Sequence, residues 1–137
     1  MENRRTFFAA MGAALAAAGA GQAAAKLNDG VQKAAGAEVL DYPFGQQHIY
    51  YQGPTDQLGF FEGGSLRLNP GQEPHPPHSH PEEEILLVTE GEGEISVDGK
   101  ITQAAPGSMM YTAADRLHGI RNTGGEPLLF YYFKWKA

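Results

Sequence analysis

The feature that most constrains the fold is a set of histidine and glutamate residues whose members lie far apart in the sequence. His78 and His80 stand two positions apart, Glu84 follows, and His118 comes much later. Prolines at positions 74, 76, 77 and 81 fix their own φ angles and push the preceding residues out of the helical region. Alternate side chains of an extended chain point to the same side, so His78 and His80 can share one metal ion.

The distance between His80 and Glu84 demands a turn. A straight strand would place their Cα atoms about 13 Å apart at ~3.3 Å per residue, too far to share an ion. The chain must therefore turn at residues 81–83 and return as the next strand. His118 has to arrive from a distant strand, which only a closed or two-sheet β structure provides.

These residues form a pattern that resembles the first motif of the cupin family. That motif is a glycine, His-x-His, a glutamate and a second glycine, which correspond here to residues in this order: Gly71, His78, His80, Glu84 and Gly91. Six residues rather than five separate Gly71 from His78.

The second cupin motif is similar to a later part of the chain. That motif begins with a glycine and a proline-glycine turn, which correspond here to Gly99 and residues 106–107. It ends with a histidine followed four residues later by an asparagine, which correspond to His118 and Asn122. Two positions depart from the motif: Ala113 and Asp115 stand where the family has proline and glycine, and Asp tolerates left-handed conformations.

The resemblance covers about residues 60–135 and implies an all-β double-stranded β-helix, a jelly roll or cupin barrel. It also implies that His78, His80, Glu84 and His118 bind one divalent metal ion. Asn122 is expected to fix the turn after the metal strand rather than to bind the ion. A flexible surface tract of histidine and proline that scavenges metal is the alternative reading of the first motif.

Two further histidines receive other predictions. His75 lies outside the motif and is expected at the rim of the site or in contact with a ligand rather than as a fifth ligand. His48 stands in a polar stretch and is expected in solvent or at the edge of the core.

Residues 1–25 resemble a twin-arginine export signal. Arg4 and Arg5 precede an Ala/Gly-rich apolar run, and 23–25 form a small-residue cleavage pattern. The apolar run is shorter and less hydrophobic than the ~20 strongly apolar residues of a membrane span. We therefore predict an exported or periplasmic protein with no membrane span in its mature form, the alternative being an uncleaved anchoring segment. Residues 26–40 are predicted to be a linker or short N-terminal segment, and 41–137 the cupin domain.

Composition excludes several kinds of partner and site. The formal net charge is -6 and no basic stripe occurs, which argues against nucleic acid and anionic membranes. The chain has no cysteine, so disulfides and thiolate ligands are excluded.

Candidate strands are separated by turns rich in Gly, Pro, Asn and Asp. They are residues 47–51, 58–61, 64–69, 74–80, 84–89, 92–97, 100–103, 108–112, 117–122 and 127–135.

Strand alternation predicts which side chains face the barrel interior. Leu86, Val88 and Ile120 should point inward, while Arg67 and Arg121 should point outward. The pool for pocket walls, in which ordinary core packing is the alternative role, is Met109, Met110, Tyr111, Phe60, Phe61 and Tyr132. No arginine is aimed inward, which argues against a phosphorylated or multiply charged substrate. Glu82 and Glu83 are expected to face solvent.

Three imidazoles and one carboxylate leave two adjacent open positions on an octahedral ion. Iron or manganese is favoured, and nickel or zinc would also fit. The predicted function is a metal-dependent, dioxygenase-like enzyme acting on a small organic substrate. The alternatives are a metal-dependent isomerase, lyase or decarboxylase, or a non-catalytic periplasmic protein that binds a metal or ligand. No side chain is assigned a catalytic role.

The C-terminal segment 128–133 is apolar on both of its alternating faces. One face fills the barrel, so the other needs a cover. A homodimer, packed through part of residues 128–135 or the N-terminal mature segment, is the predicted arrangement.

Overall fold

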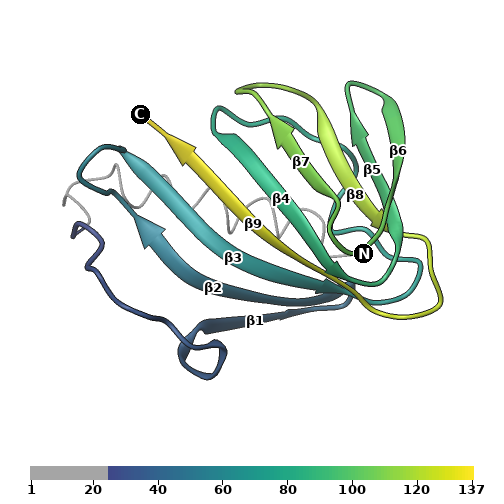
Figure 1. Cartoon of the computed structure of the whole chain (residues 1–137), viewed down its shortest axis with the longest axis horizontal. Coiled ribbons are helices and arrows are strands. Elements are labelled where there is room, and N and C mark those ends of the chain that lie inside the picture. Colours follow the sequence, from purple (N-terminus) through teal and green to yellow (C-terminus); the bar gives the residue numbers. More distant parts are fainter. Residues whose placement is uncertain (1–24) are drawn as a thin grey trace.

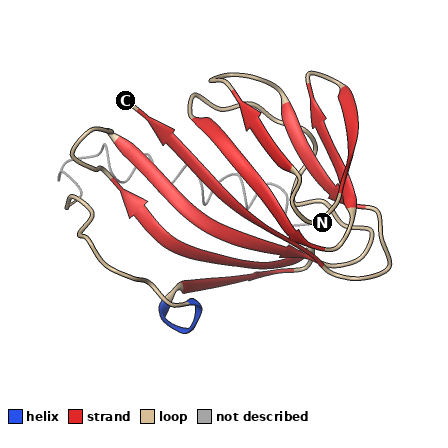
Figure 2. Ribbon diagram, viewed as in Figure 1, coloured by secondary structure: helices blue, strands red, loops and turns tan. Residues whose placement is uncertain are grey.

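The structure, a computed structural model, describes residues 25–137. Apart from residue 25, the predicted export signal lies outside this range. One helical turn, η1 (Ala34–Gly36), precedes nine strands, and Figure 2 shows how completely strands dominate the described chain. The strands are β1 (Glu38–Tyr42), β2 (Gly45–Gly53), β3 (Phe60–Leu68), β4 (Glu83–Glu90), β5 (Gly93–Val97), β6 (Lys100–Ala104), β7 (Met109–Thr112), β8 (His118–Asn122) and β9 (Leu128–Lys136).

Two antiparallel sheets make up the predicted jelly roll. The larger has the order β1-β2-β3-β9-β4-β7, and the smaller has the order β6-β5-β8. The C-terminal strand β9, yellow in Figure 1, lies between β3 and β4, so the last strand in the sequence pairs with two much earlier ones. Such long-range pairing is typical of the all-β double-stranded β-helix expected from the sequence.

The core lies between the two sheets, where alternate residues of each strand point inward. Along β9 the inward residues alternate regularly with more exposed ones. The buried apolar side chains that pack together are Phe44, Leu66, Leu68, Leu86, Val88, Ile95, Ala104, Met110, Ile120, Leu128, Phe130 and Tyr132.

The predicted facing of the strands is largely confirmed. Leu86, Val88 and Ile120 are buried, while Arg67 and Arg121 are exposed. Two candidates for the pocket wall are wrong: Met109 and Tyr111 lie on the outer side of β7, whereas Met110 between them faces the core.

Three expectations about the strands need correction. Residues 74–80 are not a strand, and only an isolated bridge at His78 joins them to β8. Prolines cannot donate to a ladder, and residues 74–77 form bends, so this segment is irregular rather than a strand. The ranges 58–61 and 64–69 form the single strand β3, which runs through Gly63 and Gly64. β1 was not expected, and it begins within the segment predicted as a linker.

Among the described residues, none of the helical structure reaches the length and apolarity that a membrane crossing requires.

Gly64 is required by the way Tyr132 packs. The two residues are directly opposed on β3 and β9. A Cβ atom on Gly64 would lie 2.7 Å from the Tyr132 hydroxyl and 2.4 Å from the backbone oxygen of His48. The His48 oxygen belongs to the backbone and cannot rotate away. Only glycine therefore leaves room for Tyr132 in its present position.

We predict that Gly64→Ala destabilises the protein by roughly 1–3 kcal/mol, the usual cost of overpacking a well-packed site. Urea unfolding measured by circular dichroism tests this. Gly125→Ala is the control, because a Cβ there meets no atom within 4 Å. Equal midpoints for wild type and Gly64→Ala would contradict the packing described here.

Candidate metal centre

The histidine cluster is assembled from an irregular segment and one strand. His78 and His80 belong to the proline-rich segment before β4, and His118 begins β8. Two backbone hydrogen bonds of 2.8 Å join the segment to the strand: His78 N–H donates to His118 O, and His118 N–H donates to His78 O. This bridge brings together residues that are distant in the sequence.

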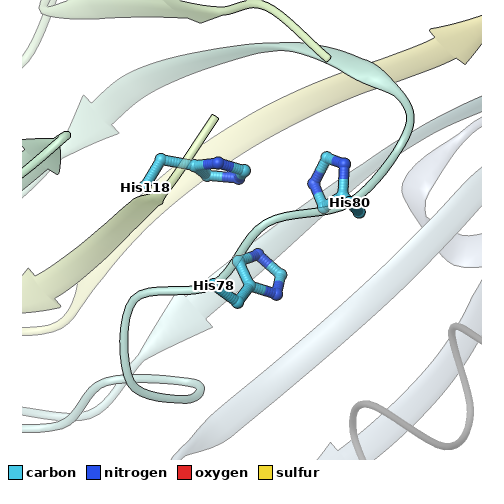
Figure 3. A group of neighbouring side chains, drawn as sticks. All are labelled: His78, His80 and His118. Atoms are coloured by element: carbon cyan, nitrogen blue, oxygen red, sulfur yellow. The ribbon is translucent and has the colours of Figure 1, made fainter. Parts of the chain in front are cut away.

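The three rings lie around a common space, as Figure 3 shows. One nitrogen from each of His78, His80 and His118 lies within 4.8 Å of the others. Donor atoms ~2.1 Å from an octahedral ion are about 3.0 Å apart when adjacent and about 4.2 Å apart when opposite. The nitrogens, up to 4.8 Å apart, are therefore more widely spaced than ligands of one ion, and the rings would have to draw together to bind it.

Glu84 lies beside this group, near the start of β4. Its Oε2 is 2.7 Å from Nε2 of His118 and 3.7 Å from Nε2 of His80. One distance is shorter and the other longer than the roughly 3.0 Å expected between adjacent ligands of one ion. The turn that was predicted between His80 and Glu84 is present, since residues 81 and 82 form a bend before β4.

Backbone carbonyls orient two of the rings. His80 Nδ1 lies 3.1 Å from Glu82 O, and His118 Nδ1 lies 2.8 Å from Arg116 O. In the tautomer in which Nδ1 donates to these carbonyls, Nε2 carries a lone pair that faces the cluster, the usual arrangement of histidine ligands. The buried Nε2 of His80 makes no hydrogen bond within the described chain, which leaves it available to an ion.

Burial keeps two of the imidazoles neutral. It lowers the pKa of His78 to about 2, helped by the neighbouring His75, and it lowers the pKa of His75 to about 4. Neutral imidazole is the form that binds a metal.

Glu84 and His118 are coupled in the opposite sense. Burial raises the pKa of Glu84, but its contacts with His118 and His80 outweigh this, and the pKa lies below its ordinary value. The pKa of His118 is raised, because contact with Glu84 outweighs the effect of burial.

A small cavity opens beside the cluster. About 40 Å³ of it is available to the centres of water molecules, room for roughly three of them at 10–15 Å³ each. Its lining residues are Leu66, Pro74, His75, His78, Glu84, Leu86, His118, Gly119, Ile120, Phe130 and Tyr132. Tyr132 was expected in the pocket wall, while Met110 and Phe60 are buried in the core without lining this cavity.

His75, His48 and Asn122 occupy distinct places. His75 is buried, lines the cavity and has its ring 3.7 Å from that of His78, so it contacts a cluster residue as expected. His48 lies on β2 outside the cluster, with its ring near Tyr50. The side-chain amide of Asn122 donates to Leu68 O and Glu126 O, and its oxygen accepts from Gly124 N–H. Asn122 therefore fixes the turn after β8.

Charged residues near the cluster were missed from the sequence. Glu82 was expected in solvent but is only 1% exposed, in the bend that precedes β4. Glu62 and Lys134 are also buried, at 1% and 2% exposure. Lys134 is two residues after Tyr132 on β9, and residues two apart on a strand face the same side. The predicted inward position of Tyr132 would therefore have predicted an inward Lys134 as well.

The cupin domain profile (Cupin_2) matches residues 64–133. An RmlC-like cupin from Shewanella frigidimarina NCIMB 400 is 16% identical, with 80% of this chain and 93% of that chain covered and a TM-score of 0.66. KdgF from Halomonas sp. is 18% identical, with 80% and 96% covered and a TM-score of 0.66. A Cupin 2 conserved barrel domain protein from Salinispora arenicola CNS-205 is 24% identical, with 82% and 92% covered and a TM-score of 0.60. At these identities the solved structures support the fold alone. None of the curated proteins compared with this chain matches it.

We predict that His118→Ala weakens divalent-metal binding by roughly a hundredfold or more, because it removes a ligand and not merely an outer contact. Metal content after dialysis, measured by elemental analysis, tests this. His48→Ala serves as the matched control and should retain its metal. The assignment would be wrong if His118→Ala kept full occupancy while His48→Ala lost it.

Proposed function

Because the chain belongs to the cupin domain family, we propose that His78, His80, Glu84 and His118 bind one divalent metal ion. We further propose that the protein is a metal-dependent enzyme of dioxygenase-like type, with iron or manganese as the favoured ion. The observation that carries the proposal is the convergence of three imidazoles and one carboxylate beside a cavity with mostly apolar walls.

The balance of buried charge supports a divalent ion. Among the described residues, the buried carboxylates are those of Glu62, Glu82 and Glu84, and Lys134 is the only buried lysine or arginine. By formal charge, three carboxylates and one ammonium leave an excess of two negative charges. Buried charge without compensation is strongly unfavourable, and a divalent cation restores neutrality. A neutral filled site suits an uncharged or singly charged substrate.

The cavity supports a small substrate. Leu66, Leu86, Ile120 and Phe130 supply apolar walls that exclude water from the space beside the cluster. Such walls leave the metal ligands as the principal polar groups that can orient a bound molecule. A metal held by these four residues would supply Lewis-acid stabilisation of a substrate oxygen and, if it is iron, the capacity to react with dioxygen.

We predict that iron-loaded protein, prepared without oxygen, consumes dioxygen when a small chelating compound is added. The candidates are small aromatic compounds, diketones and hydroxy acids, and the readout is an oxygen electrode. His118→Ala should abolish the uptake, whereas His48→Ala should retain it.

Two outcomes would replace this proposal. Turnover by manganese- or zinc-loaded protein in an isomerisation or decarboxylation, without oxygen uptake by the iron form, would favour an isomerase, lyase or decarboxylase. Metal binding with no turnover by any form would favour a periplasmic metal- or ligand-binding protein.

We propose that the protein is exported. The proposal is supported by the paired Arg4 and Arg5, the apolar run and the small residues at 23–25. The twin-arginine route carries folded proteins, so the ion could be inserted in the cytoplasm before export.

We also propose a homodimer that packs through the outer face of the larger sheet. Phe133, Tyr111 and Met109 are 39%, 56% and 63% exposed on this face. Phe133 is directly opposed to Ile85, and Ile85 to Tyr111, so apolar side chains continue across three strands. An exposed apolar patch of this kind is typical of a protein interface, and a second copy covers both patches at once.

We predict that Phe133→Glu converts the dimer into a monomer at micromolar concentration, because it places a charge within the apolar face. Light scattering coupled to size exclusion measures the mass. Ile101→Glu is the control, since Ile101 is 59% exposed on β6 of the other sheet. A monomeric wild type would remove the argument.

A further inference from the structure

A row of polar side chains crosses the inner face of the larger sheet and includes Glu84. Strand register places Thr112 opposite Glu84, Glu84 opposite Lys134, and Lys134 opposite Glu62. All four side chains are buried, with exposures between 1% and 8%. Directly opposed residues of antiparallel strands have Cβ atoms about 4.5–5.5 Å apart, so each member of the row lies beside the next.

Glu62 is already well supplied with hydrogen-bond donors. Gln52 Nε2 donates to Oε1 at 2.7 Å, and the Tyr132 hydroxyl donates to Oε2 at 2.7 Å. The Lys134 ammonium lies 3.8 Å from Oε2, which is an ion-pair distance but longer than a hydrogen bond. Lys134 and Glu62 therefore form an ion pair without a direct hydrogen bond, so the charge of Lys134 can also act on other groups.

The second neighbour of Lys134 in the row is the carboxylate of the metal site. Strand register thus places Lys134 between Glu62 and Glu84, while the ammonium itself makes its ion pair with Glu62.

We propose that Lys134 is a positioning residue that serves as the internal counter-ion of Glu84 and limits how tightly the site holds its cation. The inference rests on the proposed function, in which Glu84 is a ligand. Before metal binds, the ammonium helps the barrel tolerate buried carboxylates. Once metal is present, the ammonium and the ion are like charges near one carboxylate, and their repulsion weakens binding.

This role gives two substitutions opposite effects. Lys134→Met removes the repulsion, so binding should tighten by about tenfold. Glu62→Gln removes the negative charge on the far side of Lys134 and leaves the ammonium less compensated, so binding should weaken by roughly threefold. Simple damage to the fold would change affinity in one direction for both variants.

The experiment is titration with Co²⁺, whose visible absorption reports both affinity and coordination geometry. Urea unfolding of metal-free protein runs in parallel, where Lys134→Met should have the lower midpoint. Lys136→Met is the matched control: it makes the same charge change two positions along β9, at an exposed residue, and should leave affinity and spectrum unchanged.

Three results would overturn the proposal. The first is that Lys134→Met binds Co²⁺ no more tightly than wild type, the second is that Glu62→Gln binds it more tightly than wild type, and the third is that Lys136→Met tightens binding as much as Lys134→Met does.

If Lys134→Met does not fold, the double variant Glu62→Met with Lys134→Met replaces it, since both charges of the pair are removed together. That variant should bind more tightly than Glu62→Gln, and equal or weaker binding counts against the role. A wild type that binds no Co²⁺ would instead refute the proposed metal site.

Discussion

The pair of backbone hydrogen bonds between His78 and His118 is the constraint on which the site depends. Prolines 76 and 77 have no N–H groups to offer a sheet, so His78 is the first residue after them that can pair with β8. Its two bonds join the irregular segment to the smaller sheet, and a third bond, from Asp115 N–H to His80 O at 2.8 Å, continues the attachment. Asp115 adopts a φ of 61°, the left-handed conformation that its side chain tolerates and that glycine would otherwise supply.

Once that attachment is made, the remaining parts of the site are held by ordinary sheet geometry. Glu84 lies in β4, which pairs with β9 and β7, so its position is set by the larger sheet. Asn122 closes the turn after β8 and ties that turn to Leu68 in β3. Two of the four proposed ligands thus come from the irregular segment and one from each sheet, so the donor cluster forms only when the barrel is assembled.

Much of this could be predicted from local patterns, because strand side chains alternate with period two. The inward facing of Leu86, Val88 and Ile120 follows from that rule alone. The failures have equally local causes. The prolines among residues 74–80 suggested a strand, but they lack N–H donors, and residues 74–77 form bends instead. Gly63 and Gly64 suggest a break, yet they continue β3 because Tyr132 on the opposed strand fills the space above Gly64.

The charged interior was beyond local patterns, because it depends on which strands become neighbours. Lys134 and Glu62 are far apart in the sequence, and only the β3 and β9 pairing makes them opposed. Glu82 follows a proline and precedes β4, so its facing depends on the shape of the bend rather than on strand period. A sequence reveals which residues can face inward, while register decides which of them meet.

The inward residues of β9 show how one barrel combines stability with a functional site. In order they are Leu128, Phe130, Tyr132 and Lys134, a progression from apolar to aromatic to charged. Leu128 is opposed to Leu68 at the apolar end, and Lys134 is opposed to Glu62 at the polar end. Apolar burial at the first end supplies the free energy that folding requires. Buried charge at the polar end opposes folding unless it is balanced. The ion that the site is proposed to hold would therefore stabilise the polar end of the barrel as well as make it functional.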